Sequence, residues 1–184
     1  MECLAVPKLP AGDQWIWEIK LDGYRAEALK SGGQLFLLSR RQKSFSKQFP
    51  LVHEALADLP DNTVIDGEIV ALDETGRPDF NLLQNYRSAA KQTSYFVFDL
   101  LVLEGRDLTS LPLIERRQLM RSLKFSSPLV RLCEQFDSSA EEMVAAVRQL
   151  GVEGVIGKRK DSKYETGKRT GSWIKHRINR GQEL

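Results

Sequence analysis

The stretch "WEIKLDGYR", residues 17–25, decides how the rest of the chain is interpreted. It places Lys20 between apolar residues and follows it with Asp22 and Gly23. A lysine in an apolar run usually extends its ammonium group past its neighbours to water. Lys20 is therefore either an ordinary lysine at the edge of a strand or an amine with a chemical task. The remaining sequence has to distinguish these two interpretations.

Length and composition indicate one folded globular domain. The 184 residues are enough to bury a substantial core, and 41% hydrophobic with 28% charged residues argues against a disordered chain. The longest apolar runs, such as 95–103, are too short to span a bilayer, and residues 1–13 lack the features of a secretory signal. The two cysteines form neither a disulfide framework nor a zinc motif. We expect a reduced, cytoplasmic protein that does not associate with a membrane.

Basic residues gather in two regions, although the net charge is only +2. Nine of them lie between Gly157 and Arg180, against two acidic residues. The second group lies in the acid-free stretch 28–53 and consists of Arg40, Arg41, Lys43 and Lys47. Two such regions suggest contact with a polyanion, but solvated surface faces explain this signal equally well.

Short β-rich runs bounded by turn residues occur along the whole chain. The runs 26–30 and 35–39, joined through Ser31-Gly32-Gly33, predict a hairpin. The full set of predicted strands is 15–20, 26–30, 35–39, 63–72, 94–103, 154–158 and 172–176.

Helical segments separate these strands. In the clearest one, Ser139 and Glu142 form a capping box and Gly151 is a natural stop. Strands and helices mix without regular βαβ alternation, so the predicted class is α+β, with largely antiparallel sheets flanked by helices. The other predicted helices are 47–59, with Ser46 or a neighbour as N-cap and Pro50 in its first turn; 80–90, with Asp79 as N-cap; and 111–125.

"KLDGYR" has the form K-x-D-G-x-R, for which a chance match in a chain of this length is about one in a thousand. The motif is followed by "DGEIV" (66–70), "FVFDLL" (96–101), "EGVIGK" (153–158) and "WIKHR" (173–177). In order and spacing, this set resembles the covalent nucleotidyltransferases, which include ATP-dependent DNA ligases, RNA ligases and mRNA capping enzymes. Over residues 15–180 it looks most like the bacterial ATP-dependent DNA ligases, including the ligase module of end-joining enzymes.

The resemblance implies an enzyme with the ligase and capping-enzyme nucleotidyltransferase fold, which is ATP-grasp-like. In such an enzyme Lys20 attacks ATP to form a lysyl-AMP intermediate, with Mg²⁺ or Mn²⁺ as cofactor. AMP then passes to the 5′-phosphate of a nick in double-stranded DNA, and the 3′-OH seals the nick. The implied protein acts as a monomer.

Attack of a lysine amine on ATP would explain the residue types around Lys20. A lysine amine attacks phosphorus only when it is neutral, and about 0.1% of free lysine is neutral near pH 7.4. Apolar neighbours, cations such as Arg25 and Lys175, and a bound metal all favour the neutral amine. The apolar flank of Lys20 is then useful for reactivity.

The resemblance also assigns the nucleotide pocket. Glu18 is expected to help read adenine, with Ile19 beside it, and Arg25 to contact the sugar or a phosphate. Glu68 is expected to hold a ribose hydroxyl or assist metal binding, and Phe98 to stack on adenine. Taken individually, a strand glutamate is more often a surface residue, and an aromatic residue in an apolar strand is more often part of the core.

Further roles follow from the same resemblance. Asp22 belongs with Gly23 to the loop after the nucleophile, where a glycine lets the backbone approach a phosphate. Glu153 is expected to bind the divalent metal, and Lys158 and Lys175 to neutralise phosphate charge in the transition state.

Three arginines are the expected DNA contacts. Arg40 matches the family position near the 3′-OH strand of a nick, while Arg41 replaces the small polar residue usual after it. Arg177 replaces the second lysine of the usual lysine-x-lysine pattern, and it keeps the charge with a different reach.

Ligases of this class normally continue into an OB-fold domain. The sequence stops at "NRGQEL", close to the expected connection. We therefore expect residues 1–184 to be an adenylation domain without its OB-fold domain, which in the full-length protein works with that domain and other end-joining repair modules. An RNA ligase, a capping-type nucleotidyltransferase and a non-catalytic nick-binding module remain alternatives.

Overall fold

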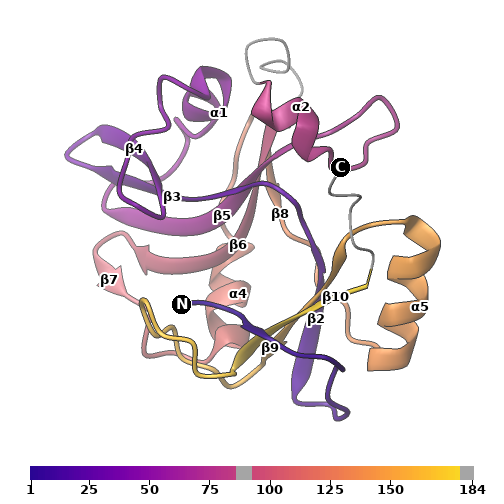
Figure 1. The fold of residues 1–184 in the computed structure, drawn as a ribbon. Helices are drawn as coiled ribbons and strands as arrows, with labels where there is room; N and C mark the ends of the chain where they lie inside the picture. Colours follow the sequence, from indigo (N-terminus) through magenta and orange to yellow (C-terminus); the bar gives the residue numbers. More distant parts are fainter. Residues whose placement is uncertain (86–92, 179–184) are drawn as a thin grey trace. The chain divides into compact units, whose positions relative to one another are not determined.

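The structure, a computed structural model, describes residues 1–85 and 93–178 (Figure 1). The chain forms two compact units, and each is described by itself. Unit 1 consists of Met1–Leu21, Leu111–Ile114 and the segment from Glu134 onward, and unit 2 of Asp22–Ser110 and Glu115–Cys133. The boundary therefore divides the K-x-D-G-x-R motif between Leu21 and Asp22.

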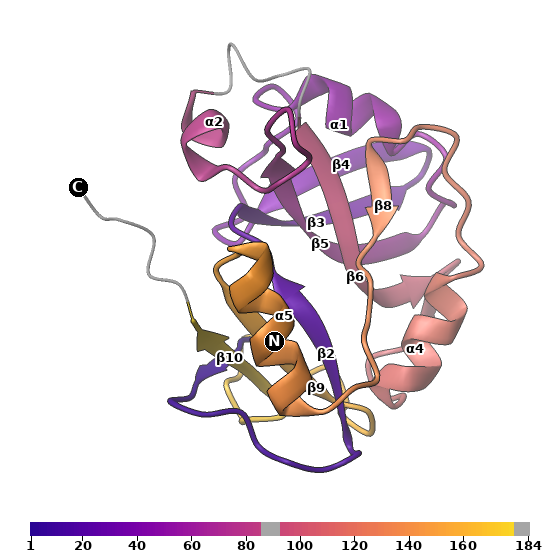
Figure 2. The same ribbon diagram turned by 90° about the vertical axis from the view of Figure 1, so that its right-hand side faces the viewer.

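Unit 1 is a four-stranded sheet with one helix on it. The strand order is β1 (Leu4–Ala5), β10 (Trp173–Arg177), β9 (Gly154–Arg159) and β2 (Trp15–Lys20). Neighbouring strands are antiparallel except for β1 and β10. Helix α5 (Ala140–Leu150) packs on β9 and β2 (Figure 2). The core between sheet and helix includes Leu9, Trp15, Trp17, Met143, Val147, Val155 and Ile174.

The ends of α5 confirm the predicted signals. The Ser139 hydroxyl accepts from the Glu142 amide at 3.2 Å, and the Glu142 carboxylate accepts from the Ser139 amide at 2.9 Å. Gly151 ends the helix with a left-handed φ of 69°. The apolar side chains Met143 and Val147 of this helix are buried, but Leu150 is 46% exposed.

Unit 2 is built on a six-stranded sheet. The strand order is β4 (Gln34–Ser39), β3 (Tyr24–Ser31), β5 (Thr63–Ala71), β6 (Thr93–Leu103) and β7 (Arg106–Asp107), and β8 (Val130–Leu132) pairs with β6 in parallel. The predicted hairpin of β3 and β4 is confirmed, with Ser31 opposite Gln34. Gly32 and Gly33 form its turn at φ values of 58° and 75°, which suits a two-residue hairpin loop.

The described helices that contribute residues to unit 2 are α1 (Pro50–Ala55), α2 (Phe80–Gln84) and α4 (Leu113–Met120) from Glu115 onward. Asp79 caps α2 as predicted, accepting from two backbone amides at 2.9 and 3.2 Å. The part of the predicted helix over 86–90 lies outside the described residues.

The expectation that Ser46 or a neighbour caps a helix over 47–59 with its side chain is wrong. Helix α1 starts at Pro50, its N-cap is Phe49, and that residue makes no side-chain cap hydrogen bond. Proline has no N–H and its ring clashes inside a helix, so it sets the start of α1. Helix α4 is also shorter than the predicted 111–125.

The α+β class with largely antiparallel sheets is confirmed. Each predicted strand has a counterpart, and the strands that were not predicted, β1, β7 and β8, are two or three residues long. Such short strands show too little alternation to be recognised. None of the helices in the described part of the chain has the length and apolar character needed to cross a bilayer.

Candidate functional site

Alternation along the strands of unit 1 brings five predicted site residues to one face of the sheet. Trp15, Trp17, Val155 and Ile174 point into the core beneath α5, so the residues between them point to the opposite face. We call this opposite side the reactive face, and it consists of Ile16, Glu18, Lys20, Ile156, Lys158, Trp173, Lys175 and Arg177.

Strand register arranges the reactive face in rows. Strand β9 lies between β2 and β10, so each row crosses β2, β9 and β10 in that order. The first row starts at the predicted nucleophile, and the second starts at the residue predicted to read adenine. The third row is the most deeply buried. The rows are Lys20–Gly154–Arg177, Glu18–Ile156–Lys175 and Ile16–Lys158–Trp173.

Lys20 and Glu153, 133 residues apart in sequence, form an ion pair. The Lys20 Nζ lies 2.5 Å from Glu153 Oε2, and the two side chains are 15% and 18% exposed. The other oxygen of Glu153 lies 3.0 Å from Arg177 Nε. One carboxylate therefore links the predicted nucleophile to a predicted DNA contact, and solvent reaches all three side chains.

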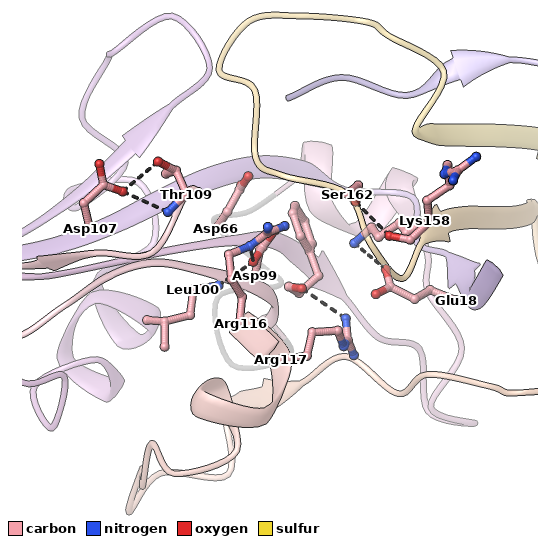
Figure 3. Close-up of polar contacts among 12 residues, drawn as sticks. Glu18, Asp66, Asp99, Leu100, Asp107, Thr109, Arg116, Arg117, Lys158 and Ser162 are labelled. Atoms are coloured by element: carbon pink, nitrogen blue, oxygen red, sulfur yellow. Dashed lines mark hydrogen bonds and ion pairs between the residues drawn. The ribbon is translucent and has the colours of Figure 1, made fainter. Parts of the chain in front are cut away.

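A second ion pair on the reactive face is buried. Lys158 Nζ lies 2.8 Å from Glu18 Oε2, and the two side chains are only 2% and 3% exposed (Figure 3). The ammonium group also lies 4.2 Å from the centroid of the Trp173 ring, a cation–π distance. In this structure the predicted phosphate contact Lys158 is thus held by the predicted adenine reader Glu18.

The side chains of two further predicted site residues of unit 1, Lys175 and Ile19, point to opposite faces of the sheet. Lys175 is half-buried on the reactive face, two positions before Arg177. Ile19 alternates to the α5 side of the sheet, opposite Val155, so its side chain does not share a face with Glu18 and Lys20.

In unit 2, the predicted nucleotide contacts also share one face of a sheet. Arg25 pairs in register with Glu68, while Ala26 and Gly67 face the core with Tyr95. The Tyr95 hydroxyl donates to the Ala26 carbonyl at 2.8 Å, and burial, with nearby carboxylates, raises its pKa well above the usual value.

Arg25 lies between an acidic and an aromatic partner. Its Nε and Nη2 donate to the two carboxylate oxygens of buried Asp66 at 3.1 and 2.6 Å. Its guanidinium carbon lies 5.5 Å from the centroid of the Phe98 ring. The structure thus brings Arg25 next to Phe98, and Phe98 is half-buried.

Glu27 lies on the same face and provides a pH-dependent prediction. Burial first, and then the carboxylate of Asp66, raise the pKa of Glu27 above its usual value. The folded protein therefore holds this proton more tightly than the unfolded chain, so ionising Glu27 destabilises the fold as the pH rises through the raised pKa. Glu27→Gln should increase the free energy of unfolding near neutral pH. The increase should shrink toward about pH 4, where unfolded glutamate is largely protonated. Urea unfolding at both pH values measures this, and an equal effect at both would contradict it.

The loop after the nucleophile has a packing reason for its glycine. A Cβ on Gly23 would lie 2.2 Å from the Ile69 carbonyl oxygen and 3.0 Å from Glu68 Cγ. Asp22 beside it is exposed. Arg40 and Arg41 are exposed in the turn after β4, where the Lys43 amide donates to the Ser39 hydroxyl at 3.1 Å.

The basic run after Gly157 is more neutral than its sequence indicates. Some acidic partners lie within the run and others come from elsewhere in unit 1, and several pairs are exposed at the surface. Besides the pairs of Lys158 and Arg177, the ion pairs are Arg159–Asp161, Lys160–Asp137, Lys168–Glu165 and Arg169–Glu2.

The metal prediction is not settled by ligand clustering. Among the described residues, no group of three or more His, Cys, Asp or Glu side chains could hold an ion. Mg²⁺ typically takes one or two carboxylates together with substrate phosphates and waters. The partly exposed carboxylate of Glu153 fits that requirement within unit 1. Glu68 belongs to unit 2.

Sequence reasoning missed three residues of unit 2. Arg116 binds Asp99 through two hydrogen bonds of 2.8 Å, and both side chains are fully buried (Figure 3). Arg117 donates to the backbone carbonyls of Phe98 and Cys133. Two consecutive arginines in "LIERRQLM" are typical of an exposed helix face, so only the fold reveals these contacts.

Comparison with known proteins gives consistent matches. The family described as "ATP dependent DNA ligase domain" matches residues 5–177. The multifunctional non-homologous end joining protein LigD of Mycolicibacterium smegmatis is 37% identical over 172 residues. The crystal structure of the ligase domain of M. tuberculosis LigD superposes with a TM-score of 0.83 at 34% identity. A mycobacterial DNA ligase D complexed with ATP and MES gives a TM-score of 0.81 at 32% identity.

The matches cover nearly the whole chain but only part of each relative. The M. smegmatis alignment covers 93% of this chain and 22% of LigD. The two structural matches each cover 95% of this chain, and they cover 58% and 60% of the solved chains. The chain therefore corresponds to a portion of a ligase domain, which is itself part of a larger protein in these relatives.

Proposed function

The chain belongs to the ATP-dependent DNA ligase domain family and is similar to the ligase domain of bacterial LigD proteins, and from this premise we propose that Lys20 is its nucleophile. The observation that carries the proposal is the row Lys20–Gly154–Arg177 with Glu153 across it. It presents an amine, a carboxylate and a guanidinium together on a partly exposed face. Residues 1–184 are proposed to form the adenylation module, and its activity is proposed to be reduced without an OB-fold domain.

The proposed reaction begins with the neutral amine of Lys20. Nζ forms a bond to the α-phosphorus of ATP, the bond from that phosphorus to the bridging oxygen breaks, and pyrophosphate leaves. The amine loses its proton to solvent, and a phosphoramidate to AMP remains. AMP then passes to the 5′-phosphate of a nick, and the 3′-OH displaces it.

Other residues are proposed to position and neutralise the nucleotide. Lys175 shares the reactive face with Lys20 and is proposed to neutralise phosphate charge, an effect that is strongest when the cation is fixed in advance. Arg25 and Glu68 are proposed to contact the sugar, and Phe98 the adenine ring. Glu18, held by Lys158, is proposed to read the base edge.

Glu153 is proposed to hold Mg²⁺ or Mn²⁺. When bound there, a divalent ion would supply positive charge to the triphosphate. Glu153 is engaged by Lys20 in this structure, and an ammonium group has no lone pair for attack. If Glu153 held such an ion, Lys20 would lose its counter-charge, which would favour the neutral amine. Glu153 is therefore proposed to pair with Lys20 at rest and to be available to the ion otherwise.

DNA contact is proposed for the exposed arginines. Arg40 and Arg41 lie at the surface of unit 2, and Arg177 is 64% exposed in unit 1. Guanidinium groups bind phosphate oxygens in two-pronged geometry. Nicked double-stranded DNA is therefore the proposed substrate.

Intact-mass spectrometry tests the proposed function. The chain is incubated with ATP and Mg²⁺, in parallel with GTP and Mg²⁺, and then denatured. The expected result is a mass gain of one AMP with ATP only, and peptide mapping should place it on Lys20. A GMP adduct instead would indicate capping-type chemistry, and an AMP adduct on a peptide without Lys20 would refute the nucleophile assignment.

A further inference from the structure

The aromatic residue proposed to stack on adenine lies in an irregularity of strand β6. In the pairing with β5, Gly67 lies opposite Val97 and Asp66 lies opposite Asp99, so the register shifts at Phe98. Such a β-bulge interrupts the ladder and re-aims the side chain of the extra residue. Bulges are enriched beside active sites, where the direction of one side chain matters.

Arg117 of α4 holds this bulge. Its Nη1 donates to the Phe98 carbonyl at 3.0 Å and its Nη2 to the Cys133 carbonyl at 2.6 Å. Cys133 directly follows β8, and its amide donates to the Val97 carbonyl at 2.7 Å. The Arg117 side chain is 3% exposed, so both charge-assisted hydrogen bonds are shielded from water.

The preceding residue of α4 fixes the next residue of β6. Arg116 binds the Asp99 carboxylate through two hydrogen bonds, and Asp99 also accepts from the Leu100 amide at 2.9 Å (Figure 3). Two consecutive residues of α4 therefore bind two consecutive residues of β6. The ring of Phe98 is left half-buried, with the Arg25 guanidinium 5.5 Å from its centroid.

We propose that Arg117 is a positioning residue for nucleotide binding, which fixes the β6 bulge so that the Phe98 ring is presented to the adenine base. This inference rests on the proposed function, because Phe98 needs a base to stack on. A buried guanidinium is expensive to desolvate, and an apolar side chain could fill the same space at lower cost. Its two hydrogen bonds to backbone carbonyls give the arginine a geometric task that packing alone would not need.

A double-mutant cycle tests the inference. Arg117→Met, Phe98→Leu and the double variant are compared for lysyl-AMP formation, with the KM for ATP and the maximal rate measured separately. Each single variant should raise the KM about tenfold, a size typical of losing one base–aromatic stack, with little change in the maximal rate. The double variant should be no worse than Phe98→Leu, because both changes remove the same interaction.

Two further variants separate positioning from general loss of stability. Arg117→Lys replaces the two-nitrogen fork with a single ammonium group, so an intermediate KM is expected, and this variant keeps the charge if Arg117→Met fails to fold. Val147→Ala removes buried volume in the core of unit 1, whereas the bulge belongs to unit 2. It should lower the melting temperature without raising the KM for ATP.

The outcomes are distinguishable. An unchanged KM in folded Arg117 variants, while Phe98→Leu raises it, would overturn the inference and leave the proposed function standing. Additive losses in the double variant would also overturn it. If Phe98→Leu leaves the KM unchanged, the adenine contact of Phe98 is wrong and the inference falls with it. If the wild-type chain forms no lysyl-AMP, both proposals fail.

Discussion

Lys20→Arg should form no AMP adduct, even after long incubation with ATP and Mg²⁺. Arginine keeps the positive charge that pairs with Glu153, but a guanidinium stays protonated in proteins and cannot attack phosphorus. The substitution therefore removes the chemistry while retaining the ion pair and the strand. Labelling with α-labelled ATP, followed by denaturing electrophoresis, measures the loss, which should reach background.

Two controls make this result interpretable. Lys175→Ala removes a charge from the same face without touching the nucleophile, so it should slow labelling but not abolish it. Thermal unfolding of Lys20→Arg should match the wild type, because the changed side chain is at a strand end and partly exposed. Persistent label in Lys20→Arg would mean that another group accepts AMP.

Arg116→Met should destabilise the fold by roughly 3–5 kcal/mol, because it leaves the Asp99 carboxylate buried without its cation. For a domain of this size, such a loss corresponds to a fall in melting temperature of about 6–20 °C. Both side chains of this pair are fully buried, so water cannot replace the missing partner. Calorimetry or urea unfolding measures the change.

The double variant Asp99→Asn/Arg116→Met tests the cause. It removes both charges but keeps a side-chain oxygen to accept from the Leu100 amide. If an unpaired charge is responsible, the double variant should be more stable than Arg116→Met alone. Equal or lower stability would point to lost packing instead.

On the reactive face, strand alternation predicts which side chains share a side of one strand, but not which strands are neighbours. Glu18 and Lys20 are two apart on one predicted strand, and Lys175 and Arg177 are two apart on another, so each pair could be assigned to one side. Their meeting depends on the register of β2, β9 and β10, and the sequence contains no local signal for it. The family resemblance assigned Lys20 and Glu153 separate roles, and their contact was not predicted.

The bulge at Phe98 could not be predicted from the residue pattern of β6. "FVFDLL" is typical of an uninterrupted strand, and nothing in it indicates that the register with β5 shifts at Phe98. The arginines that hold this region look like surface residues, because their burial arises from tertiary contacts with β6. The basic run after Gly157 misled in the opposite direction, since several of its basic residues pair with acidic residues outside the run, such as Asp137 and Glu2.

The two tryptophans of β2 link the register of this strand to the direction in which Lys20 points. Trp15 and Trp17 stack with ring centroids 6.0 Å apart and are 7% and 1% exposed, and the Trp17 indole donates to the Ser138 carbonyl at 2.9 Å. Because side chains alternate, a slip of one residue in β2 would move both indoles out of the core beneath α5 and turn Lys20 toward that core. The packing that buries the two indoles therefore also keeps Lys20 on the reactive face.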